Sequence, residues 1–203
     1  MATSPFPYIT PEQYLEIERE APFRSEYIGG VMYPHNIEHR IPGEQSMAGG
    51  LLRHAQLAAA LLTSLSNQLR GKGCQVFPSD LKVGVSQNGP FYYPDVSVVC
   101  GPPRTLHDRD EVLLNPILII ELISKSSQSF DRGAKFEQYK RIDSLQNYVL
   151  VSQSEARIEV FSRTGDLWQI TEFSGASATC HLSAIACEIP LSELYDPDAT
   201  APR

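Results

Sequence analysis

The chain has 203 residues, of which 42% are hydrophobic and 20% are charged. This length predicts one domain over residues 1–203 with a core that needs no disulfide or metal support, and the composition excludes a disordered, collagen-like or coiled-coil protein. Acidic residues outnumber basic ones by 24 to 17, and the net charge of −7 weakens, without excluding, nucleic-acid binding, because nonspecific affinity comes mostly from neutralised phosphates.

The N-terminal part of the chain predicts a helix and a hairpin. Thr10 is a helix cap, Pro11 fits the first helical position, and Gln13 completes a capping box. We therefore expect a short helix to about Glu20. Residues 25–28 and 31–33 flank the pair Gly29-Gly30, which is typical of a β-hairpin.

The clearest helix is predicted between about Glu44 and Leu69, ended by Gly71 and Gly73. Apolar residues recur in alternating steps of four and three, which predicts one buried stripe on this helix. The predicted stripe comprises Leu51, Ala55, Ala58, Leu62, Leu65 and Leu69.

The middle of the chain predicts strands and one long loop. Residues 74–85 alternate as a strand does, with a break at Pro78, and residues 91–99 form a second predicted strand. Residues 101–116 have the composition of a long mobile loop. Residues 116–124 are nearly all apolar, as expected of a central strand that is buried on both faces.

The remaining elements complete an α/β pattern. A helix is predicted from about Phe130 to Arg141, and a strand at 147–151 makes a strand–helix–strand crossover. A hairpin, a short strand and a terminal turn are expected at residues 157–163 with 167–173, 178–182 and 190–195. The predicted fold is a mixed central sheet flanked by helices, with extra β-hairpins.

Several features bear on location. The most apolar run, at 116–124, is too short for a membrane span and contains a glutamate, and the N-terminus lacks the pattern of a signal peptide. Cys74, Cys100, Cys180 and Cys187 show no C-x-x-C spacing. We expect a cytoplasmic protein whose four cysteines are reduced, mostly buried thiols.

Glu121 is the most informative candidate residue, because it is the one charged residue in the run from 116 to 124. An unpaired buried carboxylate costs several kcal/mol or raises its own pKa. Glu121 therefore needs a partner such as a metal ion or a lysine. The alternative is a structural ion pair at the open end of the strand.

Asp95 is a second isolated acid, directly after Pro94 and ahead of an apolar run. Carboxylates on neighbouring strands of one sheet would lie about 5 Å apart, a distance suited to sharing Mg²⁺, which takes one or two carboxylates and several waters. The alternative is that Asp95 is a local turn or capping residue.

Lys135 lies between Asp131 and Tyr139 at four-residue spacing, so the three side chains share one helix face. Spacing alone favours a surface salt bridge between Asp131 and Lys135. Packing of this helix beside the strand of Glu121 would instead bring Lys135 to the carboxylates.

The segments around these residues resemble a known family. The sequences YPDVSVV, IIELISKSS, FDRGAKFEQYKR and NYVLV, together with SEYIGGVMYPH and FPSDLKV, are similar to the Uma-two family of restriction-endonuclease-like proteins, which belongs to the PD-(D/E)XK nuclease superfamily. The resemblance extends over roughly residues 8–195 and implies a restriction-endonuclease-like fold.

The resemblance also implies site residues. Asp95 and Glu121 would bind Mg²⁺ or Mn²⁺ with help from the carbonyl of Leu122, and Lys135 would be a catalytic lysine that has moved from the strand to the helix, since position 123 is Ile. Lys125 is a rival for the lysine role. Glu26 would be an outer acid of the site, and His54 matches a histidine at the head of the long helix, although a lone histidine is more often structural.

The sequence departs from the family at residues 29–31, where Gly-Gly-Val replaces an Asp-Gly-Glu pattern. This loss bears on the outer part of the site more than on Asp95 and Glu121. Tyr139 is a further supporting candidate. A DNA groove could be lined by Arg104, Arg109, Arg132, Lys140 and Arg141, although acids are interleaved with them.

Three functions follow. The first is a divalent-metal-dependent nuclease that hydrolyses phosphodiester bonds, with DNA as the expected substrate. Such a nuclease could act as a homodimer. The second is a non-catalytic nuclease-like module that binds nucleic acid or protein, favoured by the net charge and the missing acids at 29–31. A hydrolase using paired carboxylates, as glycosidases do, is the weakest, because the chain has one tryptophan and no sugar-binding aromatic cluster.

Overall fold

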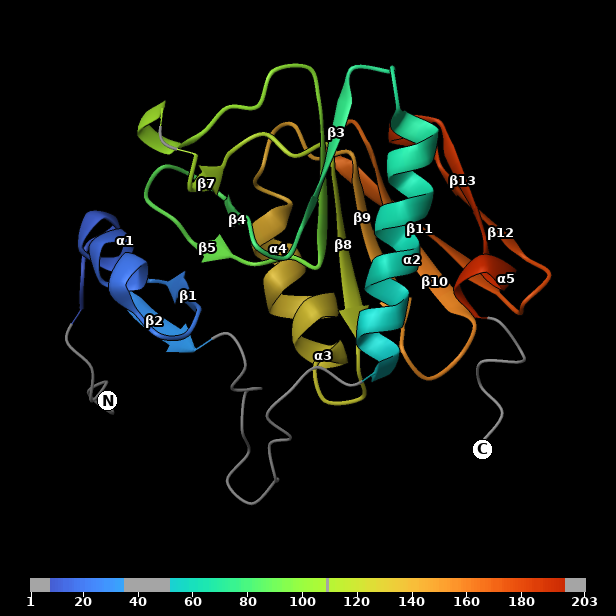
Figure 1. The fold of residues 1–203 in the computed structure, drawn as a ribbon, viewed down its shortest axis with the longest axis horizontal. Helices are drawn as coiled ribbons and strands as arrows, with labels where there is room; N and C mark the ends of the chain where they lie inside the picture. Colours follow the sequence, from blue (N-terminus) through green and yellow to red (C-terminus); the bar gives the residue numbers. More distant parts are fainter. Residues whose placement is uncertain (1–7, 35–51, 109, 196–203) are drawn as a thin grey trace.

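The computed structural model describes residues 8–34, 52–108 and 110–195. It is a mixed α/β fold in which helices lie on both faces of a central sheet and smaller β-elements flank it (Figure 1). The fold class predicted from the sequence is therefore confirmed. No helix in these ranges combines the length and apolar character that crossing a membrane requires.

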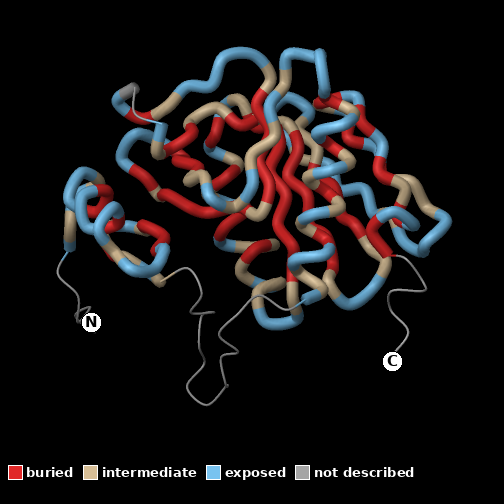
Figure 2. The backbone as a smooth tube through the Cα atoms, viewed as in Figure 1, coloured by how far each residue is buried: buried red, intermediate tan, exposed pale blue. Residues whose placement is uncertain are grey.

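The central sheet is mixed. Its six strands lie in the spatial order β11 (Leu167–Ser174), β10 (Arg157–Thr164), β9 (Asn147–Ser152), β8 (Leu118–Ile123), β6 (Val96–Cys100) and β3 (Cys74–Pro78). Strands β8 and β9 are parallel, and the other neighbours are antiparallel. The buried residues of this sheet lie in its four inner strands, β10, β9, β8 and β6 (Figure 2).

The predicted crossover between β8 and β9 is confirmed. It is helical from Gln128 to Tyr139 and consists of α3 (Gln128–Phe130), a π-helical segment (Asp131–Lys135) and α4 (Phe136–Tyr139). Single π-turns inside α-helices occur frequently at functional sites. The π-segment therefore marks this helix for attention, since it carries Asp131 and Lys135.

A second sheet combines the N-terminal hairpin with three short strands from the middle of the chain. Helix α1 (Pro11–Glu20) has the predicted capping box between Thr10 and Gln13, and the predicted hairpin is present as the first two strands. The five strands lie in the order β2 (Val31–Pro34), β1 (Ser25–Ile28), β5 (Phe91–Tyr92), β4 (Lys82–Gly84) and β7 (Val112–Leu113).

Two predicted strands are each divided between the two sheets. The predicted strand 74–85 becomes β3 and β4, and the predicted strand 91–99 becomes β5 and β6. A proline, which has no backbone donor, stands at each break and favours the end of a strand there. The second break falls at Pro94, so Asp95 stands where the chain enters the central sheet.

The segment 101–116 is more ordered than predicted. It contains a 3₁₀ turn (Leu106–Asp108) and strand β7, which pairs in parallel with β4. Leu106, Val112 and Leu113 are buried, so burial of these apolar side chains holds the segment in place. The prediction of a long mobile loop is wrong here.

The C-terminal part contains the predicted hairpin β10–β11 and a small sheet. Strand β12 (Thr179–Leu182) matches the predicted short strand, whereas its partner β13 (Cys187–Pro190) was not predicted. Another 3₁₀ turn (Ser183–Ile185) connects them, and helix α5 (Leu191–Leu194) follows at the predicted terminal turn.

Helix α2 (Leu52–Leu69) packs on one face of the central sheet, but through a different stripe from the one predicted. Its buried residues are Leu57, Leu61, Leu65 and Leu69. Ala55 is exposed, and Ala58 and Leu62 are half-buried. Burying a leucine removes more apolar area from water than burying an alanine, so the helix turns its row of four leucines toward the sheet. Residues 44–51 of the predicted helix lie outside the described residues.

Side chains of β8 alternate between the two faces of the sheet. Leu118, Ile120 and Leu122 pack in the cluster that contains α2, whereas Ile119 and Ile123 pack in the cluster that contains Phe136 and Tyr139 of α4. Glu121 shares the second face, so the strand aims it at the helical crossover.

Two of the four cysteines are bonded. Cys74 of β3 and Cys100 of β6 stand opposite each other in the register and form a disulfide, so the prediction of reduced thiols is wrong for this pair. Spacing along the chain could not show it, because 26 residues separate the two. Cys180 and Cys187 are free and buried, as predicted. The cytoplasmic location stays a prediction.

Candidate active site

The Lys135 ammonium and the Glu121 carboxylate form a buried ion pair. Lys135 Nζ lies 2.7 Å from Glu121 Oε1, and both side chains are 6% exposed. Strand β8 supplies the acid, and the π-segment of the crossover supplies the lysine. The sequence-based prediction that the helix packs beside this strand is therefore confirmed, and the expectation of a surface salt bridge is wrong.

Two further carboxylates surround the same ammonium group. Lys135 Nζ lies 3.7 Å from Asp131 Oδ1 and 3.8 Å from Glu26 Oε1, and both acids are largely buried. The rings of Tyr92 and Tyr139 lie 5.6 and 5.9 Å from Nζ, within cation–π range. We call Glu26, Glu121, Asp131 and Lys135 the acid cluster. Three acids face one lysine, so the acid cluster carries excess negative charge when all four groups are ionised.

Burial and this charge imbalance shift the pKa values of Glu121, Asp131 and Lys135. Burial raises the pKa of Glu121 well above its usual value, and nearby Asp131 and Asp95 raise it further against the lowering effect of Lys135. Burial likewise raises the pKa of Asp131. For Lys135, burial alone would lower the pKa, but the surrounding carboxylates outweigh burial and raise it. The lysine is therefore held in its charged form.

Tyr139 supports Glu121 as the helix-face pattern predicted. Its hydroxyl donates a hydrogen bond of 3.2 Å to Glu121 Oε1, and burial raises the pKa of this hydroxyl well above its usual value. The bonds from Lys135 and Tyr139 both go to Oε1. Both residues therefore fix the carboxylate through the same oxygen.

Asp95 lies beside Glu121 on the neighbouring strand. Val96 pairs with Ile120 in the antiparallel register, which places Asp95 next to Glu121 at about 5 Å between backbones. Asp95 Oδ2 accepts a 2.6 Å hydrogen bond from the backbone N–H of Leu122, and Oδ1 lies 3.1 Å from Nε2 of His54 at the start of α2. Asp95 is thus held by neighbours on both sides.

The remaining candidates divide clearly. Lys125 is exposed in the turn after β8, and in the described part of the chain its side chain takes part in no hydrogen bond or ion pair. The structure therefore brings Lys135, and not Lys125, to the acids. The Leu122 carbonyl accepts a 2.8 Å hydrogen bond from the side chain of Gln153, a residue that sequence reasoning did not identify.

The basic residues expected to line a DNA groove are partly neutralised. Arg132 pairs with Glu159 at 2.5 Å and Lys140 with Glu137 at 2.6 Å, whereas Arg141 donates to the amide oxygen of Gln138. Arg104 lies in the segment before β7, and Arg109 is outside the described residues. These positions do not form one continuous unpaired basic surface.

The chemistry of the acids suits a hard divalent cation. Within the described ranges, no three His, Cys, Asp or Glu side chains are arranged to hold a metal on their own. Mg²⁺, however, needs only one or two carboxylates and completes its shell with water. The carboxylate oxygens of Glu121 and Asp95 each have two lone pairs, and a cation would offset the excess negative charge. These residues therefore fit Mg²⁺ or Mn²⁺.

Glu121→Gln should alter how stability depends on pH. Because the pKa of Glu121 is raised in the folded state, the unfolded chain releases this proton first as the pH rises. The folded wild type therefore loses stability from about pH 4.5 upward through the raised pKa. We expect the free energy of unfolding of Glu121→Gln to exceed that of the wild type by an amount that grows as the pH rises above about 4.5, measured by urea denaturation.

The reason for expecting a stable variant is that Lys135 retains Asp131 and Glu26. A variant that is less stable than the wild type near neutral pH would show instead that the Glu121–Lys135 pair is a net stabilising structural bridge.

A family model and two similar proteins each match most of the chain. A model named Uma2, described as "Putative restriction endonuclease", matches residues 11–192. The Synechocystis sp. protein "Uncharacterized protein slr1290" is 31% identical over 196 residues, which cover 95% of this chain and 94% of that protein. "Uncharacterized protein sll1609" of the same organism is 30% identical over 176 residues, covering 86% and 93%.

A solved structure shares the fold. The crystal structure of "a putative nuclease belonging to DUF820" from Anabaena variabilis superposes with a TM-score of 0.68 and 18% identity, covering 93% of this chain and 98% of that one. At this identity the likeness shows a common architecture. The nuclease-like fold expected from the sequence is therefore confirmed.

Proposed function

The chain belongs to the Uma2 family of restriction-endonuclease-like proteins, and from this premise we propose that it is a divalent-metal-dependent nuclease that hydrolyses phosphodiester bonds in DNA. The observation that carries the proposal is the convergence of Glu121 and Lys135, 2.7 Å apart, beside Asp95 on the adjoining strand. Burying a lysine among several acids, beside a neighbouring strand that carries another carboxylate, costs free energy of folding. Such an arrangement is more typical of a functional site than of a stabilising one.

Asp95 and Glu121 are the residues that would hold Mg²⁺ or Mn²⁺, with the Leu122 carbonyl as a further oxygen. When bound, such a cation lowers the pKa of a water molecule and neutralises charge on a phosphate. The protein's contribution is to keep both carboxylates fixed. The Leu122 N–H and His54 orient Asp95, whereas Lys135 and Tyr139 orient Glu121.

Lys135 would act as a fixed positive charge. Its ammonium is surrounded by carboxylates at 2.7, 3.7 and 3.8 Å, so it keeps its proton and can donate hydrogen bonds but not accept a proton. In phosphodiester hydrolysis, negative charge grows on the phosphate oxygens, and a preorganised donor in a water-poor site stabilises it. The same ammonium would orient the attacking water through a hydrogen bond.

A non-catalytic nucleic-acid- or protein-binding module is the second candidate. The net charge of −7 and the pairing of Arg132 and Lys140 with acids favour it, because both leave few groups to neutralise phosphates. A nuclease with this surface would bind DNA weakly and lose affinity steeply with salt. Retention of metal binding separates the two candidates.

Calorimetric titration with Mn²⁺ tests the proposal without a substrate. We expect the wild type to bind Mn²⁺ and the variant Asp95→Asn to bind it about tenfold or more weakly, because a ligand charge is lost. Asp166→Asn, at the exposed turn between β10 and β11, is the matched control and should bind as the wild type does. No binding of Mn²⁺ or Mg²⁺ by the wild type would favour the non-catalytic module.

A further inference from the structure

Four residues beside the acid cluster form a closed ring of hydrogen bonds, which we call the Asp95 ring. The Leu122 N–H donates to Asp95 Oδ2 at 2.6 Å, and Asp95 Oδ1 lies 3.1 Å from His54 Nε2. His54 Nδ1 lies 3.5 Å from Gln153 Nε2, which also donates to the Leu122 carbonyl at 2.8 Å. The ring thus begins and ends on the backbone of Leu122.

The chemistry of these groups fixes the direction of every bond. A backbone carbonyl only accepts, so the group of Gln153 that faces Leu122 must be the NH₂, which has two protons to donate. Its second proton is free to bond to His54 Nδ1, 3.5 Å away, and this bond requires Nδ1 to be the unprotonated ring nitrogen. Nε2 therefore carries the ring proton and donates it to Asp95.

Gln153 itself is held in place by the sheet. It follows the last residue of β9, and its backbone N–H donates to the Ile123 carbonyl at 3.1 Å, continuing the parallel β8–β9 ladder. The side chain is half-buried and reaches across the end of β8. The carboxamide is therefore anchored by a strand rather than by a loop.

We propose that Gln153 is a positioning residue that fixes the His54 imidazole as an Nε2–H donor to Asp95 and orients the Leu122 carbonyl. This role rests on the proposed function, since Asp95 and Leu122 are the groups that would bind the cation. Gln153 does not use up their capacity. Carbonyl and carboxylate oxygens each have two lone pairs, and the ring occupies one on each. Partners of this outer kind commonly change metal affinity 10–100-fold when removed.

The first test reads the His54 ring without metal. We would record long-range ¹H–¹⁵N correlation spectra of the imidazoles at mildly alkaline pH and assign His54 with the variant His54→Gln. In the wild type, we expect Nδ1 unprotonated and Nε2 protonated. Gln153→Glu places a carboxylate oxygen beside Nδ1 and should bring a proton onto that nitrogen.

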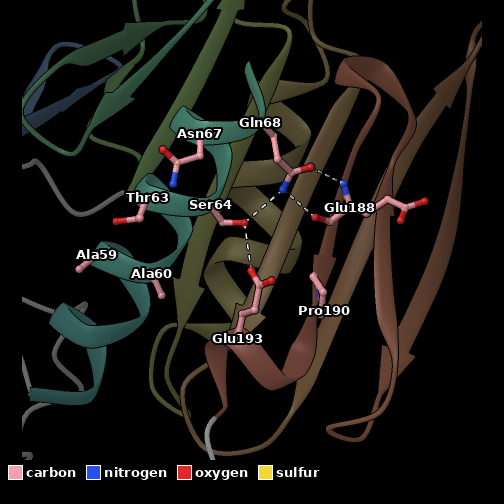
Figure 3. A pocket seen from close by; sticks show the side chains of 9 residues that line it. All are labelled: Ala59, Ala60, Thr63, Ser64, Asn67, Gln68, Glu188, Pro190 and Glu193. Carbon is pink, nitrogen blue, oxygen red and sulfur yellow. Dashed lines mark hydrogen bonds between the residues drawn. The ribbon is translucent and has the colours of Figure 1, made fainter. Parts of the chain in front are cut away.

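Gln68 provides the matched control. Its Nε2 donates to the Glu188 carbonyl at 2.7 Å and to Ser64, the same kind of bonds at a surface pocket between α2 and β13 (Figure 3). Gln68→Glu should leave the His54 signals unchanged. A protonated Nδ1 in the wild type, or His54 signals that do not respond to Gln153→Glu, would overturn the proposed arrangement.

The second test is Mn²⁺ calorimetry on Gln153→Leu. We expect about 10–100-fold weaker binding than in the wild type, with Gln68→Leu unchanged and both variants folded by circular dichroism. Equal affinity in Gln153→Leu and the wild type would refute the positioning role. Failure of the wild type to bind Mn²⁺ would refute the proposed function and, with it, the role of Gln153 in metal binding. The NMR spectra would still show whether Gln153 fixes the protonated nitrogen of His54.

Discussion

Lys135→Met should lower the free energy of unfolding by about 3–5 kcal/mol at neutral pH, the usual cost of removing one partner from a buried ion pair. The variant leaves Glu121, Asp131 and Glu26 buried around an apolar side chain. Methionine fills much of the lysine's volume, so the loss reports charge rather than a cavity. Urea denaturation measures the change, provided that the dependence of the free energy of unfolding on urea concentration has the same slope in both proteins.

The loss in Lys135→Met should depend on pH. Without the ammonium, the pKa values of Glu121 and Asp131 in the folded state rise further, so these groups retain protons that the unfolded chain releases. Stability is then retained at low pH and lost as the pH rises. The difference from the wild type should shrink as the pH falls below about 3.8, the ordinary pKa of an aspartate such as Asp131, because the carboxylates then become protonated in the unfolded chain as well.

Lys140→Met is the matched control on the same helix. Lys140 pairs with Glu137 at 2.6 Å, but its side chain is 30% exposed and that of Glu137 is 64% exposed. A surface pair of this kind contributes about 0–1 kcal/mol. If Lys135→Met cost no more than Lys140→Met, the acid cluster would not depend on its lysine, and the electrostatic description of the site would be wrong.

Asp95→Asn should reduce DNA cleavage by about 100-fold or more, the effect that removing one preorganised electrostatic group commonly has. Asparagine is close in size and keeps an oxygen that can accept from the Leu122 N–H. The fold should therefore persist while the ligand charge is lost. The measurement is single-turnover cleavage of a labelled oligonucleotide duplex at low salt.

The control for this loss is Asp166→Asn, which removes the same charge at an exposed turn. It should cleave at the wild-type rate, because Asp166 lies at an exposed turn outside the candidate site. Since both variants have the same net charge, a difference between them reports the loss of Asp95 itself. Cleavage that survives undiminished in Asp95→Asn would point to a contaminating nuclease or to a different site.

The core of the candidate site was predictable from individual residues. Glu121 was conspicuous as a lone acid in an apolar strand, and burial energetics required a partner for it. The four-residue spacing of Asp131, Lys135 and Tyr139 showed that these side chains share a face. Spacing alone favoured a surface salt bridge, however, and the packing of the helix beside β8 is what brings Lys135 to Glu121. Glu26 and His54 came from family resemblance alone, since nothing in their local sequence marks them.

Other features depend on register and tertiary packing. Gln153 contacts Leu122 across 31 residues of sequence, and only the parallel pairing of β8 with β9 brings the two together. The Cys74–Cys100 disulfide likewise follows from the pairing of β3 with β6. The choice between two apolar stripes on α2 was decided by leucine burial against the sheet. Helical periodicity allows both stripes.

The most direct test of the central claim is cleavage of supercoiled plasmid by the wild-type protein at low salt with Mg²⁺, Mn²⁺ or EDTA, beside Asp95→Asn. If Asp95 and the acid cluster form a metal-dependent phosphodiester hydrolysis site, the plasmid should be nicked or linearised with either cation, and both EDTA and the variant should abolish the products. Cleavage that continues in EDTA, or an intact plasmid under every metal condition, would contradict it.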